Sequence, residues 1–176
     1  MKSNANGDAN GEDEMTLIAE ELSKDHKLDD LVECDRILQA GGRVDSFKDT
    51  QNPLESIGPK RVWLPDQDVP GLAMSRSMGD CVAHSVGVSA EPEVLEFTLG
   101  PNDRFVVIGS DGLWEFMTNE EVCEIVLPFY IENQPEAAAN KLVREAHLKW
   151  KQEEEVVDDI TVVVIFLDTQ MAYQYY

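Results

Sequence analysis

The stretch RFVVIGSDGLWEFMTNEEV, residues 104–122, carries the strongest indication of how this chain folds. Its first six residues are a nearly continuous apolar run, which is typical of a strand buried on both faces. The SDG that follows places Asp111 directly after this strand. Asn119 and the two glutamates after it predict the start of a helix, because polar caps and early acidic residues favour a helix N-terminus.

Downstream of this stretch, the periodicity predicts helices at about 119–131 and 135–150, each with one apolar face. The second begins with a proline at its first position, where proline is favoured. The β-branched run ITVVVIFL, residues 160–167, predicts a second buried strand, and Asp158 and Asp159 come directly before it. We expect both strands in one sheet, with the two helices packed together on its outer face.

Neighbouring strands would bring Asp111 and Asp158 side by side. Paired carboxylates repel each other unless a cation or a shared proton compensates. Glu115 would face the same side as Asp111 if a helical turn begins at Gly112. Oxygen ligands of this kind suit Mg²⁺ or Mn²⁺. The alternative is that Asp111 caps a turn and Asp158 belongs to a solvated loop.

Upstream, residues 29–39 have helical spacing and are followed by the Ala40-Gly41-Gly42 stop signal. Residues 15–22 indicate a strand or one helical turn, with a strand favoured. Residues 44–59 lack a period and predict a loop. Short strands are predicted at 61–64, 86–88 and 94–99. Because strands and helices are grouped, the class is α+β, and 176 residues predict one domain.

The net charge of −21 and pI near 4.2 disfavour binding to nucleic acid or to a membrane surface. The excess acid is expected to be solvated surface, and the alternative is that some of it attracts cations. No apolar run is long enough for a transmembrane helix. The polar, acidic residues 1–14 are not a signal peptide and predict a disordered tail.

Three cysteines without a CxxC motif argue against a disulfide framework or a zinc site. They favour a reducing compartment, and so a cytoplasmic or nuclear location.

Several blocks of the sequence resemble the protein phosphatase 2C family, in that family's order and at compatible spacings. The blocks are DHK (25–27), RILQAGGRV (36–44), GLAMSRSMGD (71–80), VGVSAEPEV (86–94), FVVIGSDGLWEFMTNEEV (105–122) and DDITVVVIFL (158–167). The resemblance covers about residues 15–168 and leaves 169–176 as a C-terminal tail. It implies part of an α-β-β-α sandwich of antiparallel sheets with flanking helices, with a flap-like insertion at about 45–70.

The resemblance also implies an activity, the hydrolysis of phosphoserine and phosphothreonine in proteins by a water bound to Mg²⁺ or Mn²⁺. Asp111 and Asp158 match metal-ligand aspartates of the family. Glu115 occupies the position of an aspartate linked to a third, weaker metal. Asp159 replaces the usual asparagine and adds negative charge. Two other residues are expected to be structural, with Arg76 pairing with Asp80 or capping a turn, and Trp114 packing behind the strand end.

The family's DGHGG-like motif, which carries its metal-bridging aspartate, is absent. The chain is therefore expected to be an incomplete C-terminal portion of the domain that is inactive alone. The alternative is a catalytically inactive phosphatase-like module that acts in protein binding or scaffolding. The acidic surface would be the partner contact of such a module. The open sheet edges of an incomplete sandwich also offer a place to pair with a protein partner.

Overall fold

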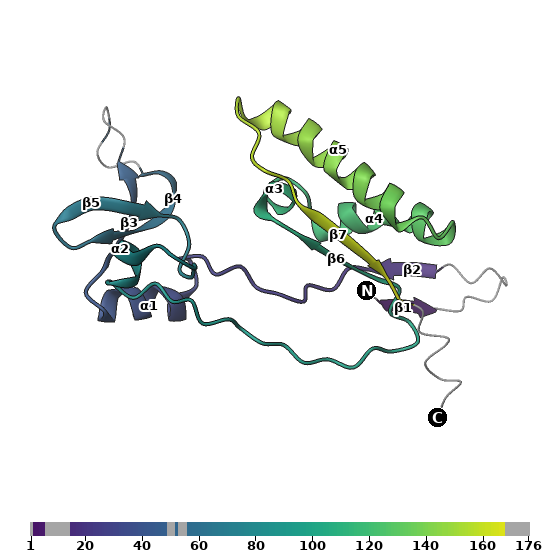
Figure 1. Cartoon of the computed structure of the whole chain (residues 1–176), viewed down its shortest axis with the longest axis horizontal. Helices are drawn as coiled ribbons and strands as arrows, with labels where there is room; N and C mark the ends of the chain where they lie inside the picture. Colours follow the sequence, from purple (N-terminus) through teal and green to yellow (C-terminus); the bar gives the residue numbers. More distant parts are fainter. Residues whose placement is uncertain (1, 6–14, 49–51, 53–55, 168–176) are drawn as a thin grey trace. The chain divides into compact units, whose positions relative to one another are not determined.

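The computed structural model describes residues 2–5, 15–48, 52 and 56–167 (Figure 1). The chain divides into two compact units, Met1–Leu22 with Glu96–Tyr176 as the first unit and Ser23–Leu95 as the second. Each unit has its own cluster of buried apolar residues. The domain bounds expected from the sequence stay a prediction. Within the described part of the chain, no helix is long and apolar enough to cross a membrane.

In the first unit, the two predicted strands lie side by side as β6 (Phe105–Gly109) and β7 (Val162–Phe166). They pair antiparallel, with Phe105 opposite Phe166 and Gly109 opposite Val162. This pairing confirms that both strands belong to one sheet. The unit's other strands, β1 (Lys2–Ala5) and β2 (Met15–Ile18), form a separate antiparallel pair.

The pairing of β1 with β2 confirms the strand predicted at the start of residues 15–22. The composition of residues 1–14 predicts a disordered tail, but residues 2–5 form a strand. The backbone groups of residues 2–5 are paired with β2 instead. The rest of that predicted tail, residues 1 and 6–14, and the predicted tail 169–176 lie outside the described residues.

Both predicted helices of the first unit are confirmed, as α4 (Asn119–Ile131) and α5 (Pro135–Glu153). A single turn, α3 (Asp111–Trp114), precedes them. The cap of α4 is Thr118, whose hydroxyl accepts from the Glu121 amide at 3.2 Å. The Glu121 carboxylate accepts in return from the Thr118 amide at 2.9 Å, which makes a capping box.

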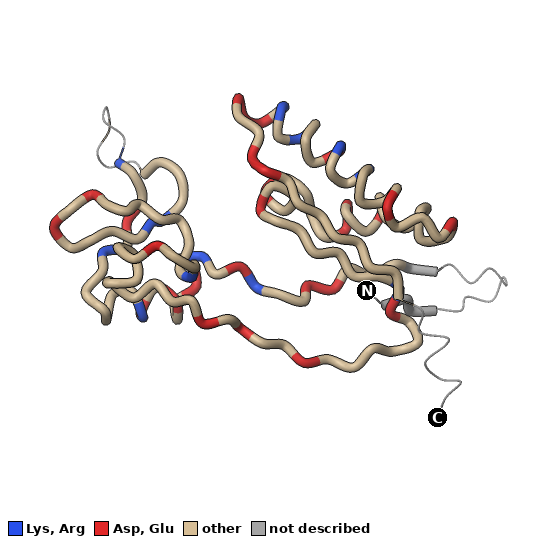
Figure 2. Tube along the Cα trace, viewed as in Figure 1, with Lys and Arg blue, Asp and Glu red and all other residues tan. Residues whose placement is uncertain are grey.

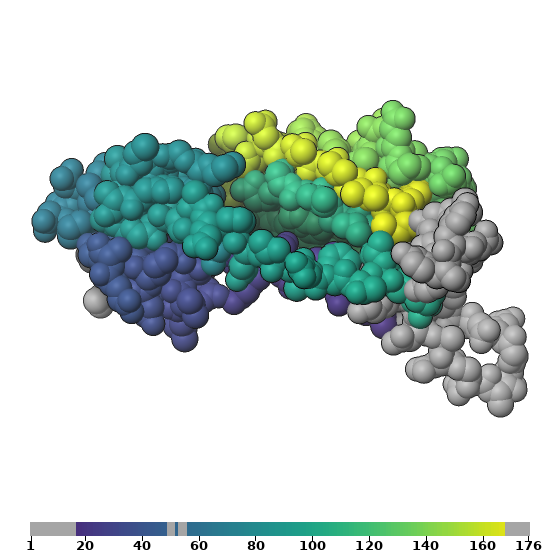
Figure 3. Space-filling view, turned by 60° about the horizontal axis from the view of Figure 1, so that its bottom comes forward, coloured from purple at the N-terminus to yellow at the C-terminus, as the bar shows by residue number. Residues whose placement is uncertain are grey.

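The core of the first unit lies between the β6–β7 sheet and helices α4 and α5. In Figure 3 the yellow C-terminal strand adjoins the green helices. Its buried members are Phe105, Leu113, Met117, Val122, Val126, Ala138, Leu142 and Ala146. The opposite sheet face is open, because the side chains of Ile108, Val163 and Ile165 are 56%, 48% and 43% exposed. The prediction that both strands are buried on both faces is therefore wrong, since the described helices cover one face only.

Leu142 of α5 is fully buried in the core of the first unit. Leu142→Ala is therefore expected to remove packing contacts of both α4 and α5 and to leave a cavity. We expect a loss of about 2–5 kcal/mol in the free energy of unfolding, measured by urea denaturation with far-UV circular dichroism. Leu148→Ala, on the same helix but 52% exposed, is the matched control. Equal losses in the two variants would contradict this packing.

The second unit contains a three-stranded antiparallel sheet in the order β3 (Arg43–Lys48), β4 (Ser56–Leu64) and β5 (Gln67–Leu72). The predicted strand 61–64 is confirmed as the end of β4. The prediction of a loop over 44–59 is wrong, because both ends of that segment pair as strands, with Phe47 opposite Ile57. Trp63 steadies this pairing by donating its indole N–H to the Asp45 carbonyl at 2.9 Å.

The predicted helix is confirmed as α1 (Leu31–Gln39), and Gly41 follows it with a φ of 87°. Its apolar residues do not all turn inward. Ile37 is buried with Glu33, whereas Leu31 and Val32 are 77% and 74% exposed.

The strands predicted at 86–88 and 94–99 are not formed. Val86 and Val88 enter the core of the second unit from a turn that follows the short helix α2 (Cys81–His84). Residues 91–100 run without regular structure, because no described strand pairs with them, and Val94 is 79% exposed.

Candidate metal centre

The end of β6 is joined to the chain that leads into β7 by three hydrogen bonds. The Ser110 amide donates to the Thr161 carbonyl at 3.0 Å, and the Thr161 amide donates to the Ser110 hydroxyl oxygen at 3.1 Å. The same hydroxyl donates to the Asp159 carbonyl at 3.1 Å. These bonds extend the pairing of the strands by one step and fix the two segments against each other.

Gly112 lets the two segments come this close. A Cβ at Gly112 would lie 2.3 Å from the backbone oxygen of Asp159, a separation that real Cβ atoms do not show. Glycine is therefore required here by a close approach of two backbones.

Asp111 and Asp158 each neighbour a residue of this contact, so both come to the same end of the sheet. Both side chains are exposed, and neither forms an ion pair with a residue that the structure describes. One carboxylate oxygen of Asp111 accepts from the Gly112 amide at 3.0 Å, and one of Asp158 accepts from the Asp159 amide at 2.7 Å. These local bonds are the ones that the turn-capping alternative predicts.

Glu115 lies one turn after Asp111, with its amide donating to the Asp111 carbonyl at 2.9 Å, and it is exposed. No three acidic, histidine or cysteine side chains in the described part of the chain converge on a common point. The structure therefore brings two of the predicted ligands to one sheet end and does not assemble a set of three. The oxygen donors suit a hard divalent cation that keeps several waters, and the assignment of Asp111, Asp158 and Glu115 stays a prediction.

The C-terminal half of α5 holds the turn that carries Asp111. Trp150 donates its indole N–H to the Gly112 carbonyl at 2.7 Å and meets Phe116 edge to face, with ring centroids 4.7 Å apart. Lys149 donates to the Phe116 carbonyl at 3.0 Å. Neither α5 residue was predicted from the sequence, although a tryptophan beside a lysine late in an amphipathic helix was the available signal.

Trp114 packs against the core of the first unit, as expected of a structural residue. Its indole N–H donates to the Gly109 carbonyl at 3.0 Å, which ties the single turn α3 back to β6.

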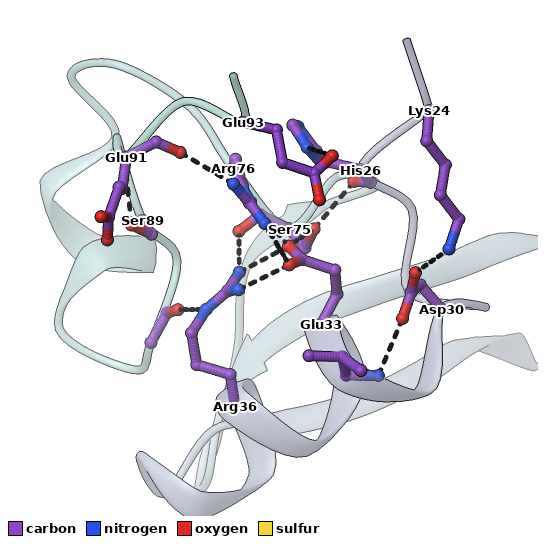
Figure 4. Close-up of polar contacts among 12 residues, drawn as sticks. Lys24, His26, Asp30, Glu33, Arg36, Ser75, Arg76, Ser89, Glu91 and Glu93 are labelled. Atoms are coloured by element: carbon purple, nitrogen blue, oxygen red, sulfur yellow. Dashed lines mark hydrogen bonds and ion pairs between the residues drawn. The ribbon is translucent and has the colours of Figure 1, made fainter. Parts of the chain in front are cut away.

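The second unit contains a buried carboxylate, Glu33, which is 3% exposed (Figure 4). Both of its oxygens accept from Arg36 at 2.7 Å, and one accepts from Arg76 at 2.7 Å. Ser75 donates its hydroxyl to the same carboxylate. The expected pairing of Arg76 with Asp80 is wrong, because the guanidinium turns inward to the buried charge.

The hydrogen bonds from Arg36, and then those from Arg76, hold the pKa of Glu33 far below its usual range. Arg36 also donates to the Gly87 carbonyl at 3.0 Å, and Arg76 to the Glu91 carbonyl at 3.0 Å. The cluster thus connects α1 to two later segments of the second unit. The buried carboxylate is held by two guanidinium groups, and these contacts across the second unit indicate a structural role.

The family model for protein phosphatase 2C matches residues 8–153. Two similar curated proteins are probable protein phosphatase 2C 52 of Arabidopsis thaliana, at 37% identity, and probable protein phosphatase 2C 64 of Oryza sativa subsp. japonica, at 35%. The alignments cover 89% and 90% of this chain but only 32% and 35% of those relatives.

Solved structures agree with this match. A serine-threonine phosphatase 2C from Toxoplasma gondii superposes with a TM-score of 0.69 at 25% identity, over 82% of this chain and 46% of that one. A C. elegans sex determining protein has a TM-score of 0.64 at 21% identity, covering 86% of this chain and 33% of the other, and it supports the fold alone. The fold is the α+β fold of these phosphatases. The chain belongs to the protein phosphatase 2C family and spans about a third of the relatives named above.

Proposed function

We propose that this chain is part of a metal-dependent protein serine/threonine phosphatase, and that Asp111 and Asp158 contribute to its Mg²⁺ or Mn²⁺ site. The observation that carries the proposal is the Ser110–Thr161 pairing, which brings both aspartates to one sheet end in a chain of this family. A bound divalent ion would supply an activated water for attack on phosphorus.

The residues of this chain have separate roles in the proposal. The carboxylates of Asp111 and Asp158 bind the cation, and Glu115 adds a weaker oxygen ligand one turn away. Asp159 adds negative charge beside the site. The substrates are proteins that carry phosphoserine or phosphothreonine, in the cytoplasm or nucleus, where the three free cysteines stay reduced.

We further propose that the chain hydrolyses little substrate by itself. The 176 residues contain no DGH motif, and a single missing electrostatic element commonly lowers a rate by about 10² or more.

The test is hydrolysis of a phosphothreonine peptide with Mn²⁺, measured for this chain, for a full-length relative, and for this chain mixed with the part of that relative that it does not match. We expect turnover in the mixture that is lost with chelator or with Asp111→Asn. Full turnover by the chain alone would contradict the proposed incompleteness. A mixture that forms a stable complex but hydrolyses nothing would contradict the phosphatase assignment.

The second candidate is a catalytically inactive binding module. It is favoured by the open sheet face, where Ile108, Val163 and Ile165 are exposed apolar residues. A stable complex with a partner protein that survives both chelator and Asp111→Asn, in the absence of any hydrolysis, would support this candidate over the first.

A further inference from the structure

A cavity of about 540 Å³ lies between α5 and the chain that leads into β7. Its volume is within the range of about 300–1,000 Å³ that is usual for binding sites. The lining residues are Val143, Arg144, His147 and Leu148 from α5, and Val157, Asp158, Asp159 and Ile160 from the facing segment. We call this cavity the α5 groove.

The α5 groove has an apolar lining between two polar walls. Arg144 and His147 lie on the helix wall, and their side chains form no hydrogen bond or ion pair with any residue that the structure describes. Asp158 and Asp159 lie on the opposite wall. An occupant must therefore present an apolar group between the walls, hydrogen-bond acceptors to α5, and positive charge to Asp159.

Further acidic residues lie next to the wall of the α5 groove that carries Asp158 and Asp159. The exposed run Glu153–Glu155 precedes it along the chain, and Figure 2 shows acidic positions at the end of α5 and along the segment that follows. No ion pair neutralises these glutamates within the described residues. The whole chain carries a net charge of −21, and most of its excess acid belongs to the first unit. The long-range field at the α5 groove therefore attracts a cationic occupant.

We propose that the α5 groove binds a basic, apolar peptide segment of a partner protein. A large apolar side chain of the segment fills the groove between Val143, Leu148 and Ile160. Its lysine or arginine neighbours face Asp159 and Glu154. Its backbone carbonyls accept from Arg144, as extended peptides bind through main-chain groups while their side chains enter pockets.

The test uses three fluorescein-labelled peptides of equal length, titrated into the full chain at low salt. In the first, Leu-Phe is flanked by Lys-Arg pairs, in the second Ser-Ser replaces Leu-Phe, and in the third Glu-Asp pairs replace the basic residues. We expect the first peptide to bind at least about tenfold more tightly than either of the others, and more weakly as salt screens the charges. Equal binding of the first two would show charge attraction without a groove, and tighter binding of the acidic peptide would overturn the choice of partner.

Two variants with matched controls locate the binding. Leu148→Asp is expected to weaken binding of the first peptide at least tenfold, whereas Ile131→Asp, at an exposed apolar residue of α4, leaves it unchanged. Glu154→Lys is expected to weaken binding several-fold, and Glu132→Lys, at the end of α4, does not.

Amide chemical shifts of the wild-type chain give a readout that does not depend on how the variants fold. We expect the first peptide to shift residues 143–148 and 157–160. Shifts confined to the open face of β6 and β7, or no binding at millimolar peptide, would overturn the proposal.

Discussion

Glu33→Gln is expected to lower the free energy of unfolding of the second unit by about 3–5 kcal/mol at neutral pH, because it leaves two guanidinium groups without their buried counter-charge. Glu33 is 3% exposed and accepts from Arg36 and Arg76 at 2.7 Å. Asp35→Asn is the matched control, since Asp35 lies on the same helix and is exposed. Trp63, the tryptophan of the second unit, reports the unfolding by fluorescence.

The same cluster predicts how stability depends on pH. The hydrogen bonds from Arg36, followed by those from Arg76, lower the pKa of Glu33 in the folded chain below its ordinary value of 4.5. A lowered folded pKa adds stability above the unfolded pKa, and this stability is lost as the pH falls toward the folded pKa. The difference between wild type and Glu33→Gln should therefore be constant above about pH 5.5 and shrink below about pH 4.5. A difference that grows on acidification would contradict the cluster.

Gly112→Ala is expected to disturb the candidate metal centre as well as the stability of the first unit. The new methyl group would lie 2.3 Å from the Asp159 carbonyl oxygen, so the turn after β6 and the segment before β7 must move apart. We expect a loss of about 1–3 kcal/mol in the free energy of unfolding, the usual range for an overpacked site. We also expect weaker binding of Mn²⁺.

The matched control is Gly100→Ala in the same unit, where a Cβ would lie 3.7 Å from the nearest atom, an ordinary contact. Both variants are measured by urea denaturation with tryptophan fluorescence, since Trp114 and Trp150 contact this turn and strand end. A Gly112→Ala variant as stable as the Gly100→Ala variant would show that the two segments do not touch as described.

The sequence predicted those elements whose signals are local. The apolar run at 104–109 predicted β6, and the β-branched run predicted β7. The helix signals at 119 and 135 placed α4 and α5 within a few residues of their observed bounds. Each of these signals depends on residues close together in the chain, where periodicity and capping act directly.

The remaining features depend on partners that are distant in the sequence. Residues 44–48 become a strand because they pair with residues 56–63, and this pairing is not visible in the period of either segment. The Glu33–Arg76 pair joins residues 43 positions apart. Ile108 is exposed because the described helices cover one sheet face only, a property of the packing rather than of the run RFVVIG.

The candidate site, like the fold, was predictable only where its signals are local in the sequence. The position of Asp111 just after β6 followed from the sequence. Asp158 was expected directly before a strand from residue 160, but β7 begins at Val162, and Asp158 reaches the same sheet end through the hydrogen bonds of Ser110 with Asp159 and Thr161. The hydrogen bonds from Lys149 and Trp150 to the turn after β6 were not predictable from the sequence, because they depend on how α5 crosses that turn.

We propose that Asp111 and Asp158 share one divalent cation, and Mn²⁺ titration of the ¹⁵N-labelled chain tests this proposal. Paramagnetic broadening should begin at the amides of residues 110–112 and 158–161, with weak affinity because few carboxylates contribute. Asp111→Asn and Asp158→Asn should each weaken the broadening at both segments, whereas Glu154→Gln, in the neighbouring acidic run, should not. Equal broadening of these amides in wild type and in the Asp111→Asn, Asp158→Asn double variant would contradict the account.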